Sequence, residues 1–287
     1  MTRFVRHYLL SLQFFTRLPV TGRLAAWVGY SPEMLRASAA HFPGVGWLIG
    51  ALVAALSALL LWALPQGGFS PLVVGAVGTG FGILLTGAFH EDGLADVADG
   101  LGGSYQRERA LDIMKDSRVG AFGAIAIAMA LLTKVALVAQ LGLMGVAVLC
   151  PVLFLAHVVS RSWPLLLIRL LPHVGDTAAS KSKPLADQIT VAALLVALLW
   201  CLAAFALVLL LVPMLTSGAT WPLQQRASAL LSALGWALAI SSLALVWMGR
   251  LFAKRLQGFT GDCLGATQQI CELAFYLGFL LGLGVRA

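Results

Sequence analysis

The side chains best suited to chemistry lie close together in the first half of the chain. Seven of the twelve acidic residues of the protein fall within residues 90–120. Asp92, Asp96 and Asp99 are spaced i, i+4 and i+7, so a helix would place their carboxylates on one face. Like charges at this spacing repel each other, so folding alone does not call for them. Clustered carboxylates are the ligands that hard divalent cations prefer, which indicates a metal site.

The second half of the same stretch repeats the acidic pattern and adds positive charge. Asp112 and Asp116 are again spaced i, i+4. Carboxylates that hold metal ions, combined with Arg and Lys side chains that neutralise phosphate charge, are typical of phosphoryl transfer. The alternative interpretation is a solvated, charge-balanced loop. The basic residues interleaved with the carboxylates are Arg107, Arg109, Lys115 and Arg118.

The rest of the chain is strongly apolar. Hydrophobic residues make up 60% of the sequence, charged residues only 11%, and the mean hydropathy is +0.92. Because a soluble domain has about 25% charged residues, this composition excludes an ordinary globular protein. The apolar runs reach the ~20 residues that cross a bilayer as a helix. The sequence therefore predicts an all-α, polytopic integral membrane protein.

We expect one membrane-embedded catalytic domain covering residues 1–287. An amphipathic helix within residues 1–19 should lie in the membrane interface, followed by a polar loop that completes an amino-terminal segment of residues 1–43. A transmembrane bundle should fill residues 44–287. Its seven expected spans are 44–64, 71–90, 120–141, 143–168, 189–212, 228–248 and 267–285.

The connections between these spans alternate in charge. Four segments carry basic residues, and the turns between them carry none. The positive-inside rule places all four basic segments in the cytoplasm and the carboxyl terminus outside. The net charge of +7 is thus a topology signal and not a nucleic-acid-binding patch. The basic segments are the amino-terminal segment, the two expected catalytic loops 90–120 and 249–266, and the loop 169–188.

The ordered set of motifs resembles the cobalamin synthase family, the adenosylcobinamide-GDP ribazoletransferases of bacterial membranes. The strongest part is GAFHEDGLADVADGLGG, residues Gly87 to Gly103, followed by DIMKDSRVG from Asp112. One departure is Glu91, where the family pattern has a neutral or apolar residue. The other matching motifs, which extend the resemblance over nearly the whole chain, are FFTRLPV, HFPGVGWLIG, Ser160-Arg161 and GFTGDCLGA.

This resemblance implies a Mg²⁺-dependent transferase at a late step of cobalamin biosynthesis, the assembly of the nucleotide loop. The hydroxyl of α-ribazole, or of its 5′-phosphate, would attack the corrinoid-linked phosphate of adenosylcobinamide-GDP. GMP would leave, and adenosylcobalamin or its 5′-phosphate would form. The expected partners are these two substrates and the lipid bilayer of the bacterial inner membrane, without nucleic acid. Other late enzymes of the pathway and a second copy of the chain are further candidates.

Roles for the acidic and basic residues follow from their type and position. Asp116 is the candidate general base, and His90 could replace it. Replacing Asp99 with Asn is expected to lower activity by roughly two to four orders of magnitude and to leave the metal-free fold intact. The candidate metal ligands are Asp92, Asp96, Asp99 and Asp112. The candidate diphosphate clamps are Lys115, Arg118 and Arg161.

Two glycine-rich segments are expected to approach the nucleotide closely, because glycine lets the backbone come near a phosphate. Three polar residues inside the spans are also notable, since buried polar groups in lipid are costly. Glu272 is expected to be functional and Lys134 structural, whereas the sequence leaves His157 open. The candidate nucleotide-binding residues are Gly100, Gly102, Gly103, Gly261, Asp262 and Gly265. The alternative for the segment that holds Asp262 is that it completes the metal site.

Two other classes of function compete with the transferase. A cation- or proton-coupled transporter would explain acidic residues in a membrane protein. However, the aspartates gather at one surface, whereas transporter sites lie near the bilayer midplane. A structural membrane subunit that anchors soluble partners would leave the aspartates unexplained.

Overall fold

The computed structural model describes residues 2–65, 67–175, 189–215 and 223–284, with the backbone alone for 212–215 and 223–227. The regular secondary structure in these ranges is helical. An isolated β-bridge joins His173 to Phe259. The prediction of an all-α protein is confirmed.

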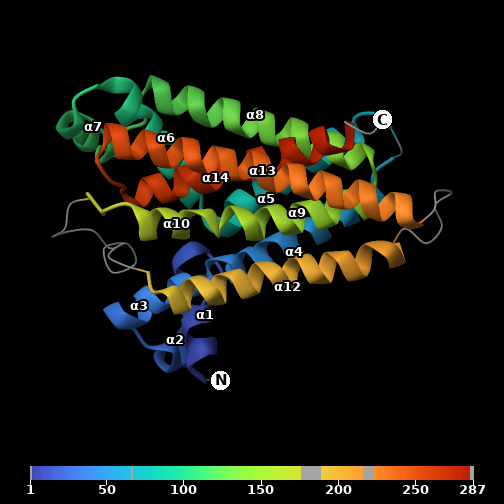
Figure 1. Cartoon of the computed structure of the whole chain (residues 1–287), viewed down its shortest axis with the longest axis horizontal. Coiled ribbons are helices and arrows are strands. Elements are labelled where there is room, and N and C mark those ends of the chain that lie inside the picture. The colour runs from blue at the N-terminus through green and yellow to red at the C-terminus, as the bar shows by residue number, and fades with distance from the viewer. Residues whose placement is uncertain (1, 66, 176–188, 216–222, 285–287) are drawn as a thin grey trace.

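The long helices lie side by side along one axis of the molecule (Figure 1). Six of the described segments are long and apolar enough to cross a membrane, and a bent pair makes up to seven. The polytopic membrane architecture is confirmed, with α9 and α10 together forming one crossing. The helices of the bundle are α4 (Phe42–Ala63), α5 (Ser70–Thr86), α8 (Ala121–Leu143), α9 (Val146–Ser160), α10 (Trp163–Leu170), α12 (Val191–Leu215), α13 (Leu223–Arg255) and α14 (Gly261–Gly284).

The bent pair corrects the expected span 71–90. Helix α5 ends at Thr86, and α6 (Phe89–Gly103) continues at 91° to it. The break occurs because Gly87 and Ala88 both adopt left-handed backbone conformations, with φ of 67° and 59°. Glycine accepts this conformation without steric cost, so Gly87 is a natural end for α5. The bend lets α6 pack against α8 and α14 near one end of the bundle.

Three segments expected to be loops are largely helical, and one of them is the expected catalytic loop 90–120, which consists mostly of α6 and α7 (Arg107–Met114). The polar loop ending at residue 43 contains α2 (Gly22–Val28), α3 (Pro32–Ser38) and the short 3₁₀ helix η1 (Ala39–His41). Ser31 begins α3 by accepting a hydrogen bond from the Met34 amide at 3.1 Å, with Pro32 at the first helical position. Serine followed by proline is a helix-start signal that the loop interpretation overlooked.

The expected catalytic loop 249–266 is much shorter than predicted. Helix α13 runs to Arg255 and α14 begins at Gly261, so only residues 256–260 connect them. Thr260 caps α14, because its hydroxyl accepts a hydrogen bond from the Cys263 amide at 3.4 Å. The last span therefore begins about six residues earlier than the expected boundary at 267, which apolarity alone had suggested.

The first helix, α1 (Thr2–Phe15), packs against α3 and α4 at the edge of the bundle. With 14 residues it is shorter than the ~20 that a span requires. Phe15, at its carboxyl end, contacts Phe42 and Phe89 edge to face, with ring centroids 4.2 and 5.5 Å away. Helix α1 therefore reaches the segment that carries the acidic residues.

The chemistry-bearing segments meet at one end of the bundle. Helix α6, α7 (Arg107–Met114) and the start of α14 lie at the left of Figure 1, and α14 ends at the opposite end. Two arginines join these segments. Arg255, at the end of α13, donates to the carbonyls of Leu101 and Ser104 at 3.0 and 2.7 Å, and Arg107 donates to that of Leu256 at 2.7 Å. The alternating arrangement inferred from charge agrees with this structure, although residues 176–188 and 285–287 lie outside the described ranges.

Candidate active site at one end of the bundle

The acidic site is formed where α6 crosses the start of α14. Asp92 and Asp96 lie on α6, and Asp262 lies in the first turn of α14. The two helices approach closely at Gly93, where a side-chain carbon would lie 2.7 Å from the Asp262 carbonyl oxygen. Burial, together with repulsion from the carboxylates of Asp262, Asp92 and Asp99, raises the pKa of Asp96 to about 7, so these carboxylates lie within electrostatic range of one another. The structure thus adds Asp262 to the acidic face that the spacing on α6 predicted.

Asp99 has a structural partner that the sequence did not reveal. Its two carboxylate oxygens accept hydrogen bonds from the backbone amides of Gly120 and Gly123, at 2.7 and 2.8 Å. These amides belong to the first turn of α8, so Asp99 caps that helix from another element. A carboxylate at a helix amino terminus is stabilised both by these bonds and by the helix dipole. The expectation that the metal-free fold stays intact without this charge therefore overlooked that Asp99 caps α8.

The second acidic pair lies outside the face shared by Asp92, Asp96 and Asp262. Asp112 is exposed on α7. Asp116, after α7, forms an ion pair with Arg118 at 2.6 Å. Hydrogen bonds from Arg118 lower the pKa of Asp116 to about 2, from an ordinary value of 3.8. A general base works best when its pKa lies near the working pH, so this pairing does not favour Asp116 as the base.

Whether this site could hold a metal ion depends on the donor groups that the structure brings together. In the described parts of the chain, no group of three or more His, Cys, Asp or Glu side chains is arranged as a metal site. The expected ligand set is thus not preassembled, since Asp99 faces α8 and Asp112 lies on α7. However, Mg²⁺ usually takes one or two carboxylates together with water and substrate phosphate. The acidic face of Asp92, Asp96 and Asp262 fits such a partly assembled site.

The glycines expected to cradle a nucleotide mainly permit close packing. A side-chain carbon on Gly100 would overlap Met114 of α7, and one on Gly265 would lie 3.3 Å from the Cα atom of His90. Gly102 lies against Phe122 and Gly103 against Ile113. Gly261 lines a cavity described below. Nucleotide contact at these positions stays a prediction, and their structural role is to bring α6, α7 and α14 together.

Glu272 is the centre of a buried polar network in the middle of the bundle. Its side chain is 1% exposed and forms an ion pair with Lys134 of α8 at 2.8 Å. Gln268 and Tyr276 donate to its two oxygens at 2.7 and 2.9 Å. Lys134 is therefore structural, as expected, but through a buried ion pair and not by reaching the membrane surface. The spacing of Gln268, Glu272 and Tyr276, i, i+4 and i+8, is the sequence signal from which this cluster could have been predicted.

The same network reaches the acidic end through α9. Arg161 donates to the carbonyl of His157 at 3.0 Å and lies 3.0 Å from its ring nitrogen Nδ1. Glu91 accepts a hydrogen bond from Gln269 at 2.9 Å and attracts Arg161 electrostatically. Glu91, the one departure from the family pattern, is thus a buried partner of α14. His157, which the sequence left open, belongs to the network.

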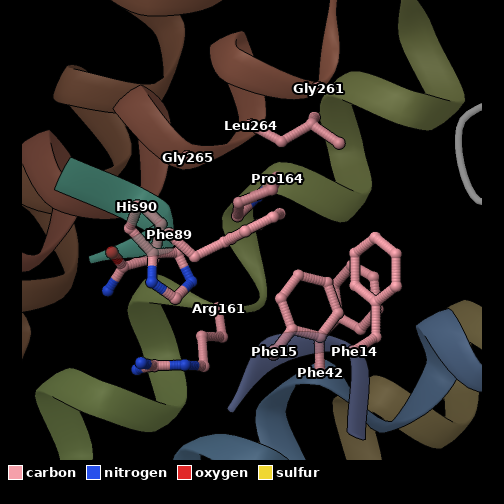
Figure 2. Close-up of a pocket in the computed structure, with 11 residues that line it drawn as sticks. Phe14, Phe15, Phe42, Phe89, His90, Arg161, Pro164, Gly261, Leu264 and Gly265 are labelled. Atoms are coloured by element: carbon pink, nitrogen blue, oxygen red, sulfur yellow. The ribbon is translucent and has the colours of Figure 1, made fainter. Parts of the chain in front are cut away.

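A small cavity lies beside the acidic face (Figure 2). Its volume is about 40 Å³. Phenylalanine rings of α1 and α4 form one wall, and Phe89 and His90 of α6 form another. Arg161 also lines this cavity, which places one of the three expected clamps there. Sequence reasoning missed the aromatic wall, because its residues come from three separate segments. The lining residues are Phe14, Phe15, Phe42, Phe89, His90, Arg161, Pro164, Gly261, Leu264, Gly265 and Gln268.

Comparison with known proteins connects this geometry to a family. The profile of the family described as cobalamin-5-phosphate synthase matches residues 7–280, which include the whole acidic end and the buried network. The chain belongs to this family. The match confirms the resemblance inferred from the motifs.

Relatives in this family match the chain over nearly its whole length. A protein of Albidiferax ferrireducens is 66% identical over 285 residues, covering 99% of this chain and 100% of its own. A protein of Polaromonas sp. strain JS666 is 56% identical, covering 98% and 99%, and one of Vibrio cholerae is 39% identical, covering 94% and 91%. All three carry the name adenosylcobinamide-GDP ribazoletransferase. No solved structure matches the chain.

Proposed function

We propose that this protein is a membrane-embedded, Mg²⁺-dependent adenosylcobinamide-GDP ribazoletransferase of the bacterial inner membrane. The observation that carries the proposal is the full-length match to relatives of that name. The acidic face on α6 and α14 supports it independently, because phosphoryl transfer needs carboxylates near a phosphate-binding surface. A transporter is not favoured, since the relatives are named as transferases and the buried charges pair with one another.

The reaction replaces a phosphoanhydride bond with a phosphate ester bond. A hydroxyl oxygen of α-ribazole attacks the phosphorus attached to the corrinoid side chain. A new P–O bond forms, the diphosphate P–O bond breaks, and GMP leaves with the bridging oxygen. The hydroxyl proton passes to a base. The 5′-phosphate of α-ribazole can react in the same way, because the bonds that change are identical.

The chain's own carboxylates would position the diphosphate through metal. Asp92, Asp96 and Asp262 are the residues proposed to hold Mg²⁺, since they face a common region at the end of the bundle. Bound Mg²⁺ would supply charge neutralisation on the phosphate oxygens. Asp99 would act as a positioning residue, because its bonds to Gly120 and Gly123 fix α6 relative to α8.

Basic side chains in the connection after α7 would bind the remaining phosphate charge. Lys115 and Arg118 are exposed in the connection between α7 and α8. They are therefore able to move toward a substrate that arrives from solution. Arginine binds phosphate in bidentate fashion, which would orient the leaving group. If Arg118 transfers to the substrate, Asp116 would lose the partner that keeps its pKa low.

The direct test is GMP release by the purified protein in detergent or liposomes. Adenosylcobinamide-GDP and α-ribazole should give GMP and the joined corrinoid in equal amounts when Mg²⁺ is present. Chelation of the metal should abolish the reaction, and renewed Mg²⁺ should restore it. The α-ribazole 5′-phosphate serves as a parallel substrate. Absence of GMP release with either acceptor, from protein whose thermal unfolding is cooperative, would refute the proposal.

A further inference from the structure

Two different helices form the facing walls of the cavity beside the acidic face. Phe14 and Phe15 belong to α1, whereas Phe89 and His90 begin α6. The rings of Phe15 and His90 are nearly parallel, with an interplanar angle of 15° and centroids 6.2 Å apart. Figure 2 shows them on different sides of the pocket. A third aromatic ring placed between two parallel rings needs roughly 7 Å, twice the contact distance of carbon atoms. The 6.2 Å between the ring centroids is less than this, so a planar ligand fits only if Phe15 moves outward while it stays parallel to His90.

The cavity also contains unsatisfied polar atoms. Arg161 is 4% exposed and Gln268 is 1% exposed, and both line the cavity. Within the described residues, Arg161 Nε and Gln268 Oε1 are buried and have no hydrogen-bond partner. Buried polar groups are normally paired, and an unpaired one costs about 1–3 kcal/mol. A ligand in the cavity could therefore supply the missing partners, an acceptor for Arg161 Nε and a donor for Gln268 Oε1.

The position of the cavity connects it with the acidic face. Gly261 and Gly265 line it, and Asp262 lies between them in the sequence. Gly265 touches the backbone of His90, two residues before Asp92. A nucleoside whose base enters the cavity would hold its sugar near Asp92 and Asp262. That is where the proposed reaction needs an attacking hydroxyl.

We propose that this cavity is the binding site for the planar base of the acceptor nucleoside, which stacks between Phe15 and His90. The inference rests on the proposed function for the identity of the acceptor. α-Ribazole is a benzimidazole nucleoside, so it offers a flat apolar ring, a ring nitrogen that accepts a hydrogen bond, and ribose hydroxyls that donate. These groups complement the apolar walls, Arg161 Nε and Gln268 Oε1. Guanine is the competing occupant. Its edge carries several polar groups, for which the mostly apolar lining offers few partners.

The cavity must widen to admit the base. Its volume of about 40 Å³ accommodates only a few water molecules, since each needs about 10–15 Å³. Widening is feasible if Phe14 and Phe15 move outward with α1 and Phe15 stays parallel to His90, because α1 lies at the edge of the bundle and carries both rings at its carboxyl end. The site is thus opened from α1, while the α6 and α14 walls are fixed by close packing at Gly93 and Gly265.

The experiment measures binding and turnover separately in the full-length protein. α-Ribazole and GMP are titrated against the purified protein, and affinity is taken from the rise in thermal stability. Phe15→Leu removes the stacking ring and should weaken α-ribazole binding about 5- to 10-fold, with GMP binding unchanged. Leu264→Phe places a larger side chain in the cavity and should weaken α-ribazole binding at least as much. Phe4→Leu is the matched control on α1, since Phe4 does not line this cavity.

Kinetics distinguish failure of this inference from failure of the proposed function. If the protein releases GMP, Phe15→Leu should raise the KM for α-ribazole and leave that for adenosylcobinamide-GDP unchanged. If the cavity variants weaken the binding of GMP and not that of α-ribazole, the cavity binds guanine and the inference is overturned. Unchanged affinities in both cavity variants would also overturn it. Selective loss of α-ribazole binding in a protein that never releases GMP would support the site and reject the proposed reaction.

Discussion

The carboxylates of α6 illustrate how neighbouring residues of one type divide their roles. Asp92 and Asp96 lie where α6 crosses Asp262 of α14, whereas Asp99, which also repels Asp96, is held by the amides that begin α8. The spacing i, i+4 and i+7 was sufficient to predict a shared helical face. It could not reveal the cap, because the partners of Asp99 are more than twenty positions away in the sequence and are backbone groups. Periodicity identifies faces of a helix, and it does not identify what each face meets.

Replacing Asp96 with Asn should separate catalysis from folding. The substitution keeps the shape of the side chain and removes one charge from a face where Asp92 and Asp262 repel it. We expect the rate of GMP release to fall by roughly two to four orders of magnitude, as for the loss of a main transition-state stabiliser. Thermal stability without Mg²⁺ should stay equal or rise slightly. A rate within a factor of three of the original protein would exclude Asp96 from the metal site.

Replacing Asp99 with Asn should instead lower stability. Asparagine has one acceptor oxygen, so one of the amides of Gly120 and Gly123 would lose its partner at a buried helix end. The expected cost is about 1–2 kcal/mol of unfolding free energy. Thermal unfolding with and without Mg²⁺ measures it, with Asp96→Asn as the control. Equal melting temperatures for the two variants would show that the cap contributes little.

Replacing Asp116 with Asn tests the general base. The pKa of Asp116 is lowered to about 2, so it is ionised at every pH from 5 to 9. Its stabilising pair with Arg118 is present above the ordinary pKa of 3.8 and is lost as the pH falls toward 2. We therefore expect the variant to lower kcat less than about 10-fold, below the range typical of a general base. The pH dependence of kcat between 5 and 9 should not change. Loss of the acidic limb of that profile would restore Asp116 as the base.

At the level of helices, the sequence predicted the apolar spans but not their ends. Hydropathy follows contact with lipid, so the middle of each span was found. The ends depend on caps such as Thr260 and on left-handed residues such as Gly87, which are single polar or small residues. The extension of α14 back to Gly261 is the clearest case, because it moves Asp262 from a loop into the first helical turn.

The pair formed by Lys134 and Glu272 should link α8 and α14 energetically. Both side chains are less than 10% exposed. Glu272→Gln would leave Lys134 charged and unpaired, at a cost of about 3–5 kcal/mol. Combining it with Lys134→Met should recover much of that loss, since replacing a whole buried pair is often tolerated. Thermal unfolding of the single and double variants measures this coupling. Additive losses in the double variant would contradict it.

For the whole molecule, charge alternation and helix direction agree on which segments share an end. Helices α6 and α7 and the 256–260 connection gather opposite the end of α14 (Figure 1). The positive-inside rule predicts that the end carrying α6 and α7 faces the cytoplasm. Composition and alternation were enough to predict this arrangement. They could not predict the cavity, because its walls come from α1, α4, α6, α10, α14 and Arg161 after α9, and depend on tertiary packing.

Orientation is testable in living cells. A reporter that is active only in the periplasm should give signal when fused to the carboxyl terminus. A cysteine introduced at Glu108, which is exposed on α7, should react with an impermeant maleimide only after the inner membrane is opened. Labelling of intact spheroplasts at Glu108→Cys would reverse the orientation.

The buried network has a consequence for the order in which the protein is made. Lys134 and Arg161 belong to helices that enter the bilayer while Glu272 is still unsynthesised or inside the ribosome. Until α14 arrives, Lys134 lacks the carboxylate that forms its ion pair in the finished bundle, and such a charge in lipid is costly. A nascent chain that stops before α14 therefore differs from a complete chain in that Lys134 lacks its ion-pair partner. The final helix acts as the closing step of biogenesis, and a cell's membrane proteases would have a physical basis for removing every chain that lacks it.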